Sequence, residues 1–261
     1  MDWILRSIKT KLTLGVISAV VVLLGVLLIM SYTSLKNYSL NNALELSETI
    51  LNDTDSKISR FFLEIDYLAD SLKRNSSVYN IQLDQMKELF ISTVYARNEY
   101  LRAIYLGTSE GEMYEWGVGE GFINNTPTFP DGYDPRVRPW YIAALDAEEF
   151  AVSDPYIYAS INALGITCVV PVYDREDKFV GVLGLDIMLQ GLASMIKDLQ
   201  VQKQGKVILL NQNFEILADQ FNEYTENITE LKIFEDAELI DDSEGYFITE
   251  LENRKMLTSY K

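Results

Sequence analysis

A long apolar run lies near the N-terminus, from Leu12 to Met30, and contains no charged residue. About 20 apolar residues in a helix cross the ~30 Å hydrocarbon core of a bilayer. A cleaved signal peptide is the alternative, but its apolar region has roughly 7–15 residues and is followed by small residues. The run here is longer, and SYTSL follows it. The pattern therefore favours an uncleaved transmembrane helix over residues 12–32.

Basic residues precede this run, whereas acidic residues predominate after it. Arg6, Lys9 and Lys11 lie on the N-terminal side. Segments rich in Lys and Arg stay in the cytoplasm. Residues 1–11 are thus expected to be cytoplasmic, and the chain beyond the helix to lie outside.

The next segment, 34–74, contains neither Pro nor Gly and predicts a long helix. Apolar residues recur along it at intervals of seven: Leu44, Leu51, Ile58, Ile65 and Leu72. Such a stripe is typical either of a dimer seam or of the face that a helix packs on its own domain. The sequence leaves both interpretations open.

The remaining pattern predicts an α+β fold with two modules. The first module is expected to contain helices at 83–97 and 140–146, strands at 101–106, 112–116, 165–173 and 179–185, and a helix at 187–199. Residues 174–177 form a predicted hairpin turn. The second module begins at Lys206, with strands at 207–210, 214–217, 246–251 and 255–260 and a turn at 211–213. It has no terminal helix and is expected to be incomplete.

Composition narrows the chemistry. A hydrophobic share of 48% supports a sizeable core, and a net charge of −17 argues against nucleic acid as a partner. The absence of His excludes imidazole bases and His-ligated metals, and Cys168 lies in an apolar run typical of an inert thiol. We expect no catalytic residues, no metal and no cofactor. An enzyme using paired carboxylates such as Asp154 and Asp186 is the disfavoured alternative.

One loop carries most of the candidate chemistry, YDPRVRPWY at 133–141. Two prolines restrict the backbone conformation of this loop. The guanidinium of Arg138 is suited to bind a carboxylate through two hydrogen bonds. Asp186 closes a later apolar strand. Structural alternatives remain open: Arg138 pairs with Asp134, Trp140 plugs the core, and Asp186 caps a helix.

Four segments, DPRVRPWY, SDPYIY, PVYD and FVGVLGLDI, together closely resemble the double Cache sensor domains of bacterial chemoreceptors and other transmembrane signalling proteins. The resemblance covers nearly everything after the apolar run. It implies two PAS-like antiparallel-sheet lobes: a long helix at 33–74, a membrane-distal ligand-binding lobe at 75–199 and a partial membrane-proximal lobe at 200–261.

Amino-acid-binding members of that family are similar at scattered positions, which fall here on Tyr133, Arg138, Trp140, Tyr156 and Asp186. The resemblance assigns the first three to the ligand carboxylate. It assigns Asp186, with Tyr156, to the α-ammonium, and Tyr141 is a plausible neighbour. Tyr158 departs from the family's usual small or acidic residue, which leaves the identity of the amino acid open.

The resemblance also implies a function and a location. The chain is expected to be the periplasmic or extracellular sensing part of a homodimeric receptor in the bacterial inner membrane, signalling as a methyl-accepting chemotaxis protein. A histidine kinase or diguanylate cyclase output, and an amine or carboxylate ligand, are the alternatives. The sensing part itself is not expected to be an enzyme.

Overall fold

The computed structural model describes residues 2–119, 121–161, 164–197, 205–210, 216–219, 245–251 and 254–260. The chain divides into two compact units. One unit comprises Met1–Leu51 with Asp242–Lys261, and the other comprises Asn52–Asp241. The second unit carries the candidate site.

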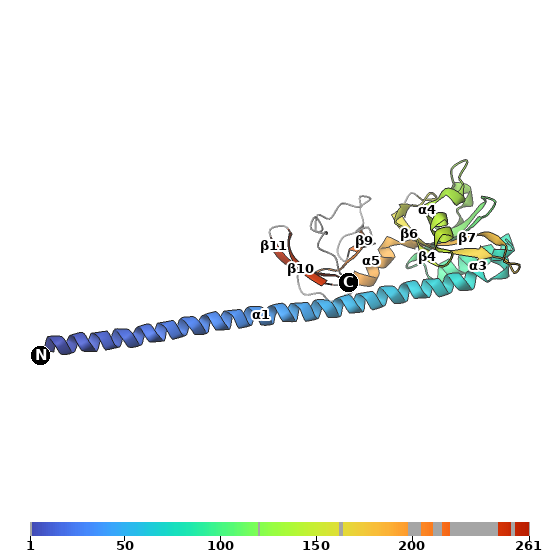
Figure 1. Ribbon diagram of the computed structural model, residues 1–261. Coiled ribbons are helices and arrows are strands. Elements are labelled where there is room, and N and C mark those ends of the chain that lie inside the picture. The colour runs from blue at the N-terminus through green and yellow to red at the C-terminus, as the bar shows by residue number, and fades with distance from the viewer. Residues whose placement is uncertain are drawn as a thin grey trace. The chain divides into compact units, whose positions relative to one another are not determined.

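The N-terminal helix, α1 (Asp2–Lys73), joins the apolar run to the long helix predicted after it (Figure 1). It is long and apolar enough to cross a membrane, and its apolar window is fully exposed. In the first unit, β10 (Gly245–Leu251) pairs antiparallel with β11 (Arg254–Tyr260). The Ser47 hydroxyl lies 3.0 Å from that of Ser259 on β11. Both strands were expected from the sequence.

The part of α1 beyond Leu51 belongs to the second unit, where its heptad stripe is part of the core. Ile65 and Leu72 of the stripe are at most 3% exposed, and the nearby Phe61 is 5% exposed. The Phe61 ring also lies 5.0 Å from that of Tyr100, edge to face. The interpretation of the stripe as core packing is thus confirmed for this part of the helix.

The second unit is built on an antiparallel sheet with the strand order β3-β2-β1-β7-β6-β4, and β5 also pairs with β6. The strands are β1 (Leu101–Thr108), β2 (Met113–Gly119), β3 (Gly121–Asn124), β4 (Ala151–Val152), β5 (Tyr156–Ile157), β6 (Leu164–Tyr173) and β7 (Phe179–Met188). The four longer strands agree with the sequence prediction. They lie where apolar residues alternate or run together, as buried strands require.

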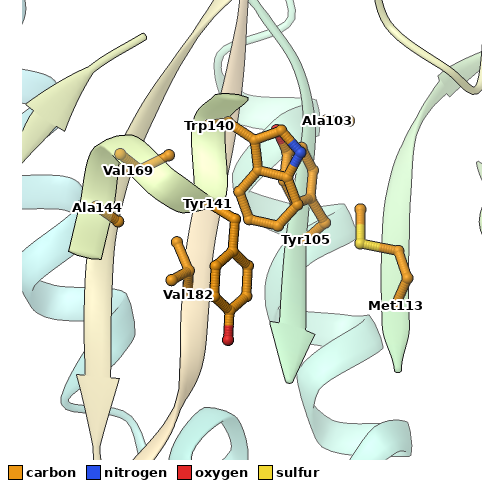
Figure 2. Packing of buried hydrophobic residues seen from close by; sticks show 8 residues of the cluster. All are labelled: Ala103, Tyr105, Met113, Trp140, Tyr141, Ala144, Val169 and Val182. Atoms are coloured by element: carbon orange, nitrogen blue, oxygen red, sulfur yellow. The ribbon is translucent and has the colours of Figure 1, made fainter. Parts of the chain in front are cut away.

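Helices cover both faces of this sheet. α3 (Leu83–Ala96) packs on one face, where the Phe90 ring lies 5.9 Å from that of Trp116. α4 (Pro139–Ala147) packs on the other, and Figure 2 shows its Trp140 and Tyr141 beside Tyr105 of β1. Adjacent strand residues point to opposite faces, so Glu115 faces the α4 side.

Short elements connect these layers: α2 (Ser76–Tyr79), and two 3-10 helices, η1 (Thr126–Thr128) and η2 (Pro135–Val137). A further helix, α5 (Leu189–Lys197), follows β7. Strand β8 (Ile208–Leu210) pairs with β9 (Ile216–Asp219), and the turn predicted at 211–213 lies outside the described residues.

The boundary between β7 and α5 corrects two expectations. β7 continues to Met188, so Ile187 lies in a strand and the helix begins at Leu189. Asp186 pairs with Ala103 of β1 and Thr167 of β6 within the sheet. Its interpretation as a helix N-cap was therefore wrong, because Asp186 lies inside β7 and two further strand residues, Ile187 and Met188, separate it from the helix.

Candidate functional site

A small pocket opens on the α4 side of the sheet, with about 200 Å³ of empty space that includes open solvent. Its walls come from β1, β2, β5, β7, α4 and two loops. The lining residues are Tyr105, Met113, Glu115, Phe129, Tyr133, Trp140, Tyr156, Tyr158, Ala159, Ser160 and Asp186. The fold thus gathers Tyr133, Trp140, Tyr156 and Asp186 from three segments: the loop 133–141, β5 and β7.

Asp186 is the most heavily hydrogen-bonded of these residues. Its Oδ1 accepts from the hydroxyls of Tyr105 and Thr167, each at 2.7 Å. Because Thr167 donates to Asp186, the Tyr156 hydroxyl, 2.7 Å away, donates to Thr167. Oδ2 accepts from Nε of Arg102 at 3.3 Å. These bonds hold a buried carboxylate in one orientation at the pocket wall.

Arg102 reaches this face because β1 contains a bulge. The pairing of β1 with β7 shifts between Leu101 and Ala103, which leaves Arg102 as an extra residue. Bulges redirect side chains in this way beside functional sites. Nη2 of Arg102 donates to Oε1 of Glu115 and to the Ser160 hydroxyl. Arg102 therefore joins two carboxylates, Glu115 and Asp186.

The buried network carries a negative excess when both carboxyls are ionised, since Arg102 supplies one positive charge. Burial raises the pKa of Glu115 to about 7, while Arg102 opposes the rise. Burial likewise raises the pKa of Asp186, again against the pull of Arg102. Burial also raises the pKa values of Tyr105 and Tyr156 well above the usual range, so both remain neutral hydroxyls.

The loop before α4 presents Arg138 beside Tyr133, with the guanidinium carbon 5.7 Å from the ring centroid. Asp134 does not pair with it: that carboxylate accepts hydrogen bonds from the Arg136 side chain and backbone instead. Within the described part of the chain, Nε of Arg138 is a buried donor without a hydrogen-bond partner. A buried donor of this kind lowers the stability of the fold unless another group accepts a hydrogen bond from it.

Comparison with known proteins identifies the family. A sequence profile of the Cache domain matches residues 31–261. The chain belongs to the Cache domain family.

Relatives and solved structures agree with this assignment. The methyl-accepting chemotaxis protein McpB of Bacillus subtilis is 26% identical over 239 residues, which is 88% of this chain and 34% of that protein. The chain thus spans about a third of the length of this curated relative. The ligand-binding domain of the Campylobacter jejuni chemoreceptor Tlp3, in complex with 4-methylisoleucine, matches with a TM-score of 0.67 and 18% identity. The match covers 83% of this chain and 85% of that domain.

A second structure, the ligand-binding domain of the Pseudomonas fluorescens chemoreceptor CtaA in complex with L-serine, matches with a TM-score of 0.63 and 20% identity. It covers 83% of this chain and 88% of that domain. At these identities the structures establish the Cache fold of the chain, in agreement with the α+β prediction.

Two of the predicted site residues lie away from the wall of the Cache domain pocket. Arg138 is not among the lining residues, although its neighbour Tyr133 is. Tyr141 packs in the hydrophobic core, and its hydroxyl donates to the Thr108 carbonyl at 3.3 Å. Figure 2 shows its ring extending from α4 along Val182.

Sequence reasoning missed Arg102, Tyr105 and Glu115. Each lies in a strand otherwise rich in apolar residues, and a charged residue inside such a strand was the available signal for two of them. Tyr158, where the sequence departs from the family's usual residue, lines the pocket. Its hydroxyl donates to the carbonyls of Ile166 and Ile187, so it also fixes β5 against the sheet.

Proposed function

We propose that this chain is the extracytoplasmic sensing part of a bacterial transmembrane chemoreceptor and that it binds an amino acid in the pocket. The apolar run of α1 would anchor it, with residues 1–11 in the cytoplasm by the positive-inside rule. The relative McpB, a methyl-accepting chemotaxis protein, supports this output. Because the chain spans about a third of that relative, the output module itself is part of the proposal.

The observation that carries the proposal is the separation of charge around the pocket. The sheet side holds a carboxylate-rich network around Asp186. On the loop side Arg138 adjoins the lining residue Tyr133 without lining the pocket itself, and its buried Nε has no partner in the described part of the chain. A zwitterion presents one charge to each side. Burying either ligand charge without a partner costs several kcal/mol, so the arrangement selects for molecules that carry both.

In this proposal each end of the amino acid has its own residues. Asp186 accepts from the α-ammonium through Oδ2, which receives only the long bond from Arg102 in the described part of the chain. Arg138 receives the carboxylate, with Tyr133 and Trp140 beside it. Tyr156 contributes its ring near the ammonium, and such cation–π contacts contribute about 0.5–2 kcal/mol. The amino acids in the Tlp3 and CtaA structures support this ligand class.

Signalling would follow from a difference in affinity between two states. The ligand bridges Arg138 and Asp186 and favours a more closed pocket. In a homodimer, closure would shift α1 relative to its counterpart in the partner. A typical coupling of this kind is about 1–3 kcal/mol.

The test is a thermal-shift screen of the full chain in nanodiscs against the standard L-amino acids, matched amines and matched carboxylic acids. A ligand at 100 times its Kd adds about 2.7 kcal/mol to the free energy of unfolding. We expect one or a few amino acids to stabilise the chain. We expect Arg138→Ala and Asp186→Asn each to weaken binding at least about 30-fold, because each leaves a ligand charge unpaired.

Arg136→Ala is the matched control, since Arg136 lies on the same loop, is exposed and pairs with Asp134. It is expected to leave the affinity unchanged. Stabilisation by amines or acids alone, or equal affinity in Arg138→Ala, would contradict the zwitterion site.

A further inference from the structure

The pocket contains a second buried carboxylate that the zwitterion site does not use. Glu115 lies on β2 with its side chain 3% exposed, and it lines the pocket. A structural role as a counter-ion of Arg102 explains its burial. It does not explain what the second carboxylate oxygen does beside a ligand pocket.

The hydrogen bonds of Glu115 fall on one of its two oxygens. Oε1 accepts from Arg102, from Nδ2 of Asn125 at 2.8 Å and from the Ser160 hydroxyl at 3.0 Å. No hydrogen bond reaches Oε2 from the described part of the chain. The three donors therefore fix the carboxylate and leave an oriented acceptor beside the pocket.

Charge balance restricts what this acceptor receives. When both are ionised, Asp186 and Glu115 carry two negative charges against the single positive charge of Arg102, and the α-ammonium of an amino acid restores neutrality. A ligand side chain with its own carboxylate would add a negative charge next to Glu115. Like charges placed together across an interface cost several kcal/mol.

The side chains that line the pocket also restrict the size of the ligand. The pocket is narrow, because large side chains line it closely. Phe129 and Met113 line it, and Tyr158 is held by two backbone carbonyls and cannot withdraw easily. A long cationic side chain would need these groups to move.

Resting on the proposed amino-acid site, we propose that Glu115 is a specificity-determining residue that accepts a hydrogen bond from the ligand side chain. The preferred ligands are small amino acids with a neutral donor, a hydroxyl or a carboxamide, and acidic amino acids are rejected. Burial raises the pKa of Glu115, and a hydrogen bond donated by the ligand would stabilise its ionised form.

The test compares isosteric ligand pairs by calorimetry on the full chain in nanodiscs. L-Asparagine and L-aspartate differ by an amide against a carboxylate, and L-serine and L-alanine by a hydroxyl. The unmodified chain is expected to prefer asparagine over aspartate at least tenfold. In Glu115→Gln this ratio is expected to fall at least tenfold, and the preference for serine over alanine is expected to fall with it.

Glu112→Gln removes an exposed glutamate from the same hairpin and is the matched control; its ratio is expected to equal that of the unmodified chain. If amino acids bind but the asparagine-to-aspartate ratio is the same in Glu115→Gln, Glu115 is structural and this inference fails alone. If no amino acid binds the unmodified chain, the proposed function fails with it. Should Glu115→Gln not fold, a preference for aspartate over asparagine in the unmodified chain overturns the inference, and the expected preference supports it.

Discussion

Arg102 bridges the carboxyl groups of Asp186 and Glu115, and burial raises the pKa of each. It is 2% exposed, and burial works against its own charge, but Asp186 and Glu115 outweigh that effect and raise the pKa of Arg102. The guanidinium of Arg102 thus stabilises two carboxylates in the wall of the pocket. Because buried ion pairs gain their energy only with full hydrogen bonding, the donors from Tyr105 and Asn125 are part of the same arrangement.

The titration of Glu115 gives a prediction for stability. Its pKa is about 7 in the fold and near the model-compound value of 4.5 when unfolded. The folded chain therefore binds more protons between these values, so the contribution of Glu115 to stability is present below about pH 4.5 and lost as pH rises to about 7. Glu115→Gln removes this loss.

The measurement is the melting temperature of the full chain in nanodiscs from pH 4.5 to 8, with and without the substitution. The difference between Glu115→Gln and the unmodified chain is expected to shift in favour of the variant as pH rises through the window. A difference that stays constant with pH would contradict it. Glu112→Gln again serves as the control.

At the scale of elements, the aromatic side chains of the site depend on glycines in the strands beneath them. A Cβ on Gly184 of β7 would lie 2.2 Å from Cε2 of Tyr105, and a Cβ on Gly165 of β6 would lie 2.1 Å from the Tyr158 hydroxyl. The absence of these side chains lets both rings approach the strands closely. The Tyr105 hydroxyl then reaches Asp186.

Gly184→Ala is expected to displace the Tyr105 ring, because the two strands that carry these residues are paired and cannot separate. Overpacking of this kind costs about 1–3 kcal/mol. The expected result is a lower melting temperature together with weaker binding of the best amino acid. Gly25→Ala, where the new Cβ meets no atom within 4 Å, is the control. An unchanged affinity in Gly184→Ala would show that the position of Tyr105 does not affect ligand binding.

At the scale of the whole molecule, the proposed sensor requires the chain after the apolar run to lie outside the cell. The single cysteine makes this testable. Cys168 is buried, and burial raises the pKa of its thiol, so it is expected to be inert toward maleimides. Cysteines introduced at exposed positions on α1 then report their own side of the membrane.

Tyr38→Cys is expected to react with a membrane-impermeant maleimide in intact cells, whereas Ile8→Cys is expected to react only after lysis. Both positions are exposed, at 66% and 56%. The unmodified chain serves as the control, because it shows how much maleimide labelling comes from Cys168. Labelling of Ile8→Cys in intact cells, with Tyr38→Cys protected, would reverse the proposed orientation.

The sequence by itself determined the features that depend on local pattern. A charge-free run marked the apolar part of α1, and the heptad stripe marked its continuation. Apolar alternation or apolar runs marked the longer strands, and helical spacing of apolar residues marked α3 and α4. The loop 133–141 was also evident, because its prolines and aromatic residues are contiguous. Local pattern further indicated Asp186, but not that it lies within a strand.

Only the tertiary structure decided which side chains meet in the pocket. Residues facing one side of a sheet are set by strand register, and the bulge that turns Arg102 toward Glu115 has no reliable signature in the sequence. Likewise Tyr141 is adjacent to Trp140 in the chain and both pack in the core, but a helix turns consecutive residues by about 100°, and of the two Trp140 also lines the pocket. The charge balance of the site follows from these placements, and with it the selectivity proposed for Glu115.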